Sequence, residues 1–173
     1  MKRVELEGRF LGDGEGPLDA PARVAIWPEL ATCYAALGQK DEARALTLPV
    51  FSEPRPSTCE AVLRINSLDT IHGLRDIEAL TKLDKLPDAI MLPKVKAAAE
   101  IHLLDELLQG AAEKLKYHVI VETNAGLENI YEIAGASKRI VSLLFGEVDM
   151  SADLRCRRTP TALLYARSRT VHA

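Results

Sequence analysis

Four short apolar runs, each followed by a longer segment with apolar residues at helical spacing, dominate the chain from residue 60 onward. The runs span residues 61–65, 89–92, 117–121 and 140–145. Runs this short, rich in Val, Ile and Leu, are typical of strands buried on both faces of a parallel sheet. The segments between them predict helices, which are the crossover connections that parallel strands require.

The predicted helices follow the runs in the same order. Residues 70–83 and 96–115 place leucines and isoleucines three and four positions apart, and residues 127–133 do so over a shorter stretch. Thr159 and Pro160 are typical of a helix start, which predicts a last helix running to the final residue. This alternation predicts an α/β fold, either an open doubly wound sheet or a (β/α)₈ barrel.

The N-terminal part of the chain is less regular. Residues 22–27 predict a short strand, and residues 29–46 are typical of a helical hairpin, which by itself would favour an interaction module. Residues 49–56 predict an irregular connection. The sequence therefore predicts two parts: an atypical N-terminal segment, residues 1–59, and an α/β domain, residues 60–173.

Charge and composition narrow the classes of function. The 173 residues carry a formal net charge of −3, whereas a nucleic-acid surface needs a basic patch to meet phosphate. The apolar runs are far shorter than the roughly 20 residues that cross a membrane. No apolar leader is visible at the N-terminus, and the three cysteines are widely spaced. These features predict a cytoplasmic protein with no nucleic-acid or membrane partner.

Polar side chains stand at the carboxyl end of each predicted strand. Arg64 and Asn66 end the first strand, Lys94 follows the second, Glu122 the third and Asp149 the fourth. The carboxyl ends of parallel strands share one edge of a sheet, and active sites form at that edge. We therefore expect these five side chains to lie close together.

The residue types at this edge indicate their chemistry. Glu122 and Asp149 predict a Mg²⁺ site, because this cation prefers oxygen ligands and keeps several waters. Arg64 presents a planar pair of donors for a carboxylate or a developing enolate. Asp149 is also compatible with a helix cap or a surface position. Glu122 directly follows Val119-Ile120-Val121, so burial without a partner would be costly.

Four stretches around the strand ends can be compared with known families, and they are residues 63–67, 91–95, 120–123 and 144–154. In order and approximate spacing they resemble the citrate lyase β-subunit group of the HpcH/HpaI aldolase family, and malyl-CoA and citramalyl-CoA lyases are similar. The resemblance covers residues 60–173, about two-thirds of the chain. The family's opening Phe-Val-Pro-Gly strand and its acidic Asp-Leu-Glu-Asp run have no counterpart here.

The resemblance implies a (β/α)₈ barrel that holds Mg²⁺ on Glu122 and Asp149. It implies that Arg64, with Asn66 and Lys94 beside it, binds an acyl-CoA or 2-oxo acid substrate whose carbon–carbon bond is cleaved or formed. Family members continue beyond the point that matches residue 173. The expected fold is therefore an incomplete barrel of about four βα units, working as a homo-oligomer or with a chain that completes the barrel. The alternative is a catalytically inactive, truncated member that serves as a subunit or interaction partner.

Overall fold

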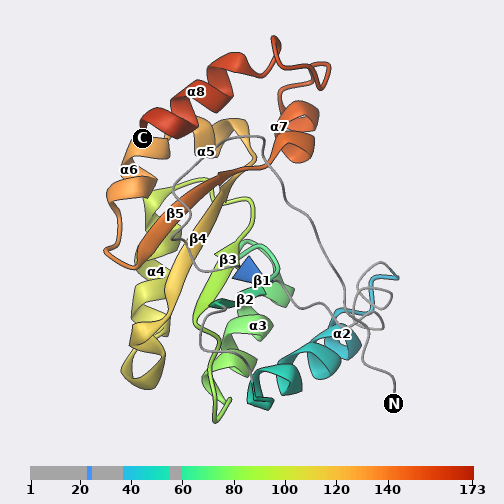
Figure 1. Cartoon of the computed structure of the whole chain (residues 1–173), viewed down its shortest axis with the longest axis vertical. Helices are drawn as coiled ribbons and strands as arrows, with labels where there is room; N and C mark the ends of the chain where they lie inside the picture. The colour runs from blue at the N-terminus through green and yellow to red at the C-terminus, as the bar shows by residue number, and fades with distance from the viewer. Residues whose placement is uncertain (1–22, 25–36, 55–59) are drawn as a thin grey trace.

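The computed structural model of the chain describes residues 23–24, 37–54 and 60–173. Strands and helices alternate through most of this part, and the C-terminal helices gather at one end of the sheet (Figure 1). The elements are, in chain order, β1 (Arg23–Val24), α2 (Lys40–Thr47), the 3₁₀ helix η1 (Leu48–Ser52), β2 (Glu60–Arg64), α3 (Ile71–Thr81), β3 (Ala89–Leu92), α4 (Ala98–Leu107), the 3₁₀ helix η2 (Gly110–Lys114), β4 (Lys116–Val121), α5 (Asn124–Glu128), α6 (Ile130–Gly135), β5 (Ile140–Phe145), α7 (Glu147–Asp153) and α8 (Leu164–His172).

The five strands form one sheet in the order β1-β2-β3-β4-β5, and every neighbouring pair is parallel. A doubly wound sheet reverses its strand order at a switch point, whereas a (β/α)₈ barrel adds each new strand beside the previous one. The observed order is that of a barrel. The fold is therefore an α/β structure with an incomplete (β/α)₈ barrel, as the sequence predicts.

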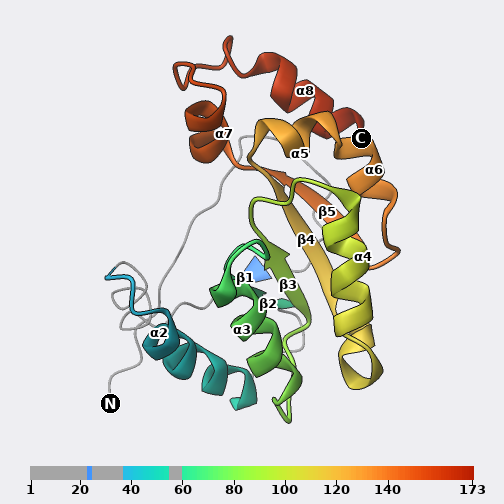
Figure 2. The same cartoon turned by 180° about the vertical axis from the view of Figure 1, so that it is seen from behind.

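One face of the sheet builds the main core. Leu63, Ile90 and Tyr117 are aligned across β2, β3 and β4 and are all buried. Leu80 of α3 and Leu104 of α4 belong to the same cluster and are fully buried. These two helices lie in front of the sheet in Figure 2. Alternate residues of each strand point to this face, because side chains alternate along a strand.

The opposite face of the sheet is concave. His118 of β4 lies on it, and its Nε2 is 3.2 Å from Oε2 of Glu60 in β2, across the intervening strand β3. The Nδ1 of His118 is 2.6 Å from Oγ of Ser142 in β5. Alternate strands of a flat sheet are about 9.6 Å apart, so a contact across β3 agrees with the inner face of a barrel, where the strands curve toward one another. His118 is buried, in keeping with a structural role.

The structure divides two of the predicted helices. Residues 96–115 form α4 and η2, which are separated by Leu108 and Gln109. The 3₁₀ helix η2 begins at Gly110, whose φ of +67° lies in the left-handed region that an α-helix cannot use. The helix predicted at residues 127–133 begins earlier, at α5, where the Thr123 hydroxyl accepts a hydrogen bond from the Gly126 N–H. It continues as α6 after a break at Asn129. Helical spacing indicated the elements but not their breaks.

Other boundaries also differ from the prediction. The connection predicted as irregular contains η1, and α7 follows β5 where no helix was predicted. The last helix begins at Leu164, since Thr159 caps only a preceding turn. Of the predicted N-terminal elements, Arg23–Val24 is a strand and α2 is the second helix of the predicted hairpin, whereas the remainder lies outside the described residues.

No helix of the described residues is long and apolar enough to cross a membrane.

Candidate active site

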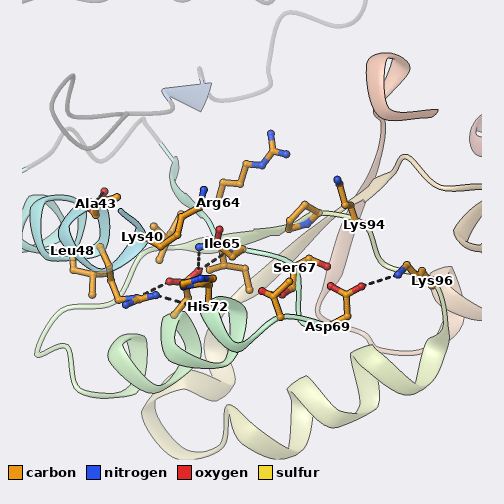
Figure 3. A pocket seen from close by; sticks show the side chains of 17 residues that line it. Lys40, Ala43, Leu48, Arg64, Ile65, Ser67, Asp69, His72, Lys94 and Lys96 are labelled. Atoms are coloured by element: carbon orange, nitrogen blue, oxygen red, sulfur yellow. Dashed lines mark hydrogen bonds and ion pairs between the residues drawn. The ribbon is translucent and has the colours of Figure 1, made fainter. Parts of the chain in front are cut away.

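Arg64 is the last residue of β2, and its side chain is exposed. Figure 3 shows it extending away from the strand beside a pocket. In the described part of the chain its guanidinium takes part in no hydrogen bond or ion pair. A planar set of donors without a protein acceptor at the carboxyl edge of the sheet suits an anionic ligand.

Glu122 directly follows β4, and only 3% of the residue is exposed. Its Oε1 accepts a hydrogen bond of 3.0 Å from the backbone N–H of Lys94. Lys94 has a φ of +55°, an uncommon conformation for a side-chain-bearing residue, and this turn after β3 brings the N–H to the carboxylate. The ends of β3 and β4 are thereby connected through Glu122.

Gly146, the residue after β5, lies against the same carboxylate. A Cβ placed at this position would be 2.5 Å from the Glu122 Cβ and 2.6 Å from its Oε2. Real Cβ atoms do not approach so closely, so only glycine allows the chain to pass here. The absence of a side chain at Gly146 therefore lets the chain that leads into α7 pack directly against Glu122.

Asp149 lies in the first turn of α7, which begins directly after Gly146. Its side chain is about half exposed, and its Oδ1 is 3.6 Å from the Nζ of Lys94. Lys94 therefore contacts both acids, Glu122 through its backbone and Asp149 through its side chain. The helix that carries Asp149 is the one that the sequence analysis missed.

The electrostatics of Glu122 reflect this arrangement. Burial raises the pKa of Glu122 above its ordinary value, and the nearby charge of Asp149 raises this pKa further. The charge of Arg64 and the hydrogen bond from Lys94 act on the pKa in the opposite direction. The structure thus brings Arg64, Lys94, Glu122 and Asp149 into one electrostatic neighbourhood.

Asn66 is placed differently from these four residues. Its backbone N–H and its side-chain Nδ2 both donate to Oδ2 of Asp76 in α3, each over 2.7 Å. The side-chain amide nitrogen is therefore engaged by the protein. Asp76 was not identified from the sequence, although Gly73, Asp76, Ile77 and Leu80 share the buried side of α3. An acid on the apolar side of a predicted helix is the signal that points to it.

A pocket of about 790 Å³ opens beside Arg64, between the carboxyl edge of the sheet and α2 (Figure 3). Its cationic side chains outnumber its carboxylates among the lining residues that the structure describes. Lys96 and Asp69 pair over 2.7 Å within it, and this hydrogen bond lowers the pKa of Asp69. The cationic residues of the lining are Lys40, Arg44, Arg64, Lys94 and Lys96, and its carboxylates are Asp69 and Asp76.

The chain is thus an incomplete (β/α)₈ barrel protein with a pair of acids and an arginine at the carboxyl edge of its sheet. Residues 31–173 match the HpcH/HpaI aldolase/citrate lyase family, and the chain belongs to this family. The match begins before residue 60 and includes α2.

Named relatives agree with this assignment. Citrate lyase subunit beta of Leuconostoc mesenteroides is 35% identical over 147 residues, which are 80% of this chain and 48% of that protein. L-malyl-CoA/beta-methylmalyl-CoA lyase of Cereibacter sphaeroides is 35% identical over 157 residues, with 80% and 49% covered. The chain spans about half the length of these relatives.

A solved structure shares the fold. The CitE protein of Mycobacterium tuberculosis, crystallised with magnesium and acetoacetate, superposes with a TM-score of 0.60 at 27% identity. The similarity covers 78% of this chain and 53% of that protein. Among the described residues of this chain, no three His, Cys, Asp or Glu side chains cluster as a metal site.

The raised pKa of Glu122 leads to a test of stability. A carboxyl group whose pKa is raised in the native state destabilises that state at every pH above its unfolded-state pKa, so Glu122→Gln should raise the unfolding temperature of the protein in EDTA at neutral pH. The gain should be present at pH 7 and disappear as the pH falls below about 4.3, where the carboxyl is protonated in native and unfolded chains alike. A contribution on the order of 1 kcal/mol corresponds to roughly 2–4 °C in a chain of this size.

Thermal unfolding followed by circular dichroism measures this effect. The Gln side chain still accepts the Lys94 hydrogen bond, so the variant removes the charge and keeps the contact. Glu132→Gln, at an exposed position in the first turn of α6, is the matched control and should change little. A lower unfolding temperature for Glu122→Gln at pH 7 would contradict the assigned electrostatics.

Proposed function

We propose that this chain carries the reaction centre of a Mg²⁺-dependent carbon–carbon lyase that acts on the CoA thioester of a hydroxy acid. One observation carries the proposal: the buried Glu122 and the half-exposed Asp149 converge beside Arg64 at the carboxyl edge of a parallel sheet. The names of the relatives support the reaction class, and the magnesium of the related crystal structure supports the cofactor.

The two carboxylates suit Mg²⁺. Oxygen ligands and open water positions are what this cation requires. Glu122 offers Oε2 beside Gly146, because Oε1 is engaged by Lys94. A cation shared with Asp149 would also offset the repulsion between the two acids that raises the pKa of Glu122.

When bound, Mg²⁺ would stabilise negative charge on substrate oxygen atoms as a Lewis acid. In the direction of cleavage, the hydroxyl group of the substrate loses its proton and becomes a carbonyl. The carbon–carbon bond breaks, its electron pair moves to the carbon beside the thioester, and that carbon later takes up a proton. Arg64 would bind the substrate carboxylate or the enolate oxygen with two parallel donors.

The pocket beside Arg64 supports an anionic substrate. Its surplus of cationic side chains would attract carboxylate or phosphate groups. Lys94 lies at the boundary between the pocket and the acid pair, so we assign it to substrate binding. Asn66 also lines the pocket, with its amide nitrogen held by Asp76.

Metal binding gives the first test. We expect wild-type chain to bind one Mg²⁺ and both Glu122→Ala and Asp149→Ala to lose at least tenfold in affinity, since each removes a ligand. Isothermal titration calorimetry measures this loss directly. Glu147→Ala removes an exposed acid from the same turn of α7 and should leave the affinity unchanged. Unchanged affinity in both acid variants would refute the assigned ligands.

The second test concerns turnover. Arg64→Lys should lower kcat by about 10²–10³ and leave Mg²⁺ bound, because an ammonium cannot present two parallel donors to the developing charge. The assay is release of acetyl-CoA or a 2-oxo acid from malyl-, citramalyl- or citryl-CoA. Arg75→Lys, on the exposed side of α3, is the control. Wild-type activity that survives Arg64→Lys would remove Arg64 from the mechanism. No wild-type turnover with Mg²⁺ and a full-length relative added would favour a non-catalytic subunit.

We also propose that the active form has a closed barrel, completed by a further part of the protein or by a second chain. Within the described residues β5 pairs with β4 on one side only, and Val141 of β5 is 47% exposed. An unpaired strand edge of this kind associates readily. Sedimentation of the 19.0 kDa chain should therefore show a dimer or larger species. A compact monomer at high concentration that binds Mg²⁺ would contradict completion by a second chain.

A further inference from the structure

The loop that follows Arg64 is held by one buried carboxylate. Asp76 of α3 is only 8% exposed, and its Oδ2 accepts hydrogen bonds from both the backbone N–H and the Nδ2 of Asn66. Both distances are 2.7 Å. Asn66 lies two residues after Arg64, so these bonds fix the backbone immediately beyond the end of β2.

A close packing contact fixes the same loop independently. A Cβ at Gly73 of α3 would be 2.2 Å from the backbone oxygen of Ser67, so the loop touches the helix backbone. On the other side, the Ile65 N–H donates to the Met91 oxygen of β3 over 3.2 Å. The backbone on either side of this short loop is therefore determined by neighbouring elements.

The second oxygen of Asp76 is bound by a residue from α2. The Nε of Arg44 donates to Oδ1 of Asp76 over 2.7 Å, and Nη2 of Arg44 donates to the backbone oxygen of His72 over 3.3 Å. The Arg44 and Asp76 side chains are 12% and 10% exposed, so this ion pair is shielded from water. Dashed lines beside His72 in Figure 3 mark hydrogen bonds and ion pairs between residues that line the pocket.

Arg64 itself depends on this backbone. Its guanidinium has no protein partner within the described residues, so no side-chain contact from this part of the chain orients it. The direction in which it leaves β2 is therefore set by the backbone of Arg64 and its neighbours. Asp76 is the buried charge that binds this backbone within the described residues, through the Asn66 N–H.

We propose that Asp76 is a positioning residue for Arg64 and that Arg44 keeps the Asp76 carboxylate in place. Helix α2 would then support the reaction centre through Arg44, although it contributes no group that touches the reacting atoms. The catalytic consequence rests on the proposed function, whereas the structural consequence does not. Misplacing a catalytic group by about 1 Å can cost about 10²-fold in rate.

Three variants test the proposal. Asp76→Asn can still accept from Asn66 but presents an amide to Arg44, and Arg44→Met removes the pair from the α2 side. We expect each to lower kcat by about 10–100-fold with a small change in KM and unchanged Mg²⁺ affinity. The double variant should lose little more than Arg44→Met alone, because Arg44→Met already removes the ion pair with Asp76, together with the contacts of Arg44 to Asp41 and the His72 oxygen. Glu78→Gln neutralises an exposed acid of the same helix and should behave as wild type.

A second measurement does not require turnover. Amide hydrogen exchange at Asn66 and the NMR signal of the Arg64 Nε–H should show a loop that is more mobile in Asp76→Asn and Arg44→Met than in wild type. If wild type binds no Mg²⁺ and turns over no thioester, the proposed function fails while this result still stands. If Asp76→Asn does not fold, the same exchange and NMR measurements on Arg44→Met test the proposal. Unchanged exchange, unchanged Arg64 signal and unchanged kcat in a folded variant would overturn the inference.

Discussion

The burial of the Glu122 carboxylate beside a second carboxylate is the constraint on which the carboxyl edge of this sheet depends. An ionised acid that is 3% exposed costs free energy unless donors or cations surround it. The protein supplies the backbone N–H of Lys94 and the more distant charge of Arg64, and these only partly offset the burial and the repulsion from Asp149. An unsatisfied charge maintained in this way is typical of a functional site rather than of a packed core.

Hydrogen bonds between successive loops keep this costly arrangement in place. Asp69, in the loop after β2, pairs with Lys96 in the loop after β3. The backbone oxygen of Lys96 accepts from Asn129, which stands between α5 and α6. Asp153 at the end of α7 accepts from the N–H of Asn124 at the start of α5. These bonds join successive loops and helices at the carboxyl edge. Moving Glu122 and Asp149 apart would therefore strain or break them, beginning with the bond between Asp153 and Asn124.

Much of this arrangement could be predicted from the sequence. The order of short apolar runs predicted the parallel sheet, and the residues that end the runs, Arg64, Lys94 and Glu122, are those that the structure brings together. Their assignment needed only the alternation of strands and the rule that carboxyl ends share one edge. Assignment of the family needed the ordered motifs as well, and the match over residues 31–173 confirms it.

The parts that could not be predicted depend on three-dimensional contacts. Helix α7 has only seven residues, too few for helical periodicity to reveal, although it positions Asp149. The break between α4 and η2 lies just before Gly110, whose left-handed backbone no spacing of leucines indicates. Asp76 and Arg44 lie 32 positions apart in the sequence, so a single sequence gives no reason to pair them.

On the concave face of the sheet, the polar residues near the amino ends of the strands differ in their interactions from those near the carboxyl ends. Toward the amino ends, Glu60, His118 and Ser142 satisfy one another across three strands. Toward the carboxyl ends of the same strands β2 and β4, Arg64 has no acceptor in the described part of the chain and Glu122 faces another acid. Polar groups that are mutually satisfied stabilise a curved sheet, and polar groups left incomplete bind ligands. The chemistry of this protein is therefore expected where its hydrogen bonding is least complete, at the edge that the loops hold together.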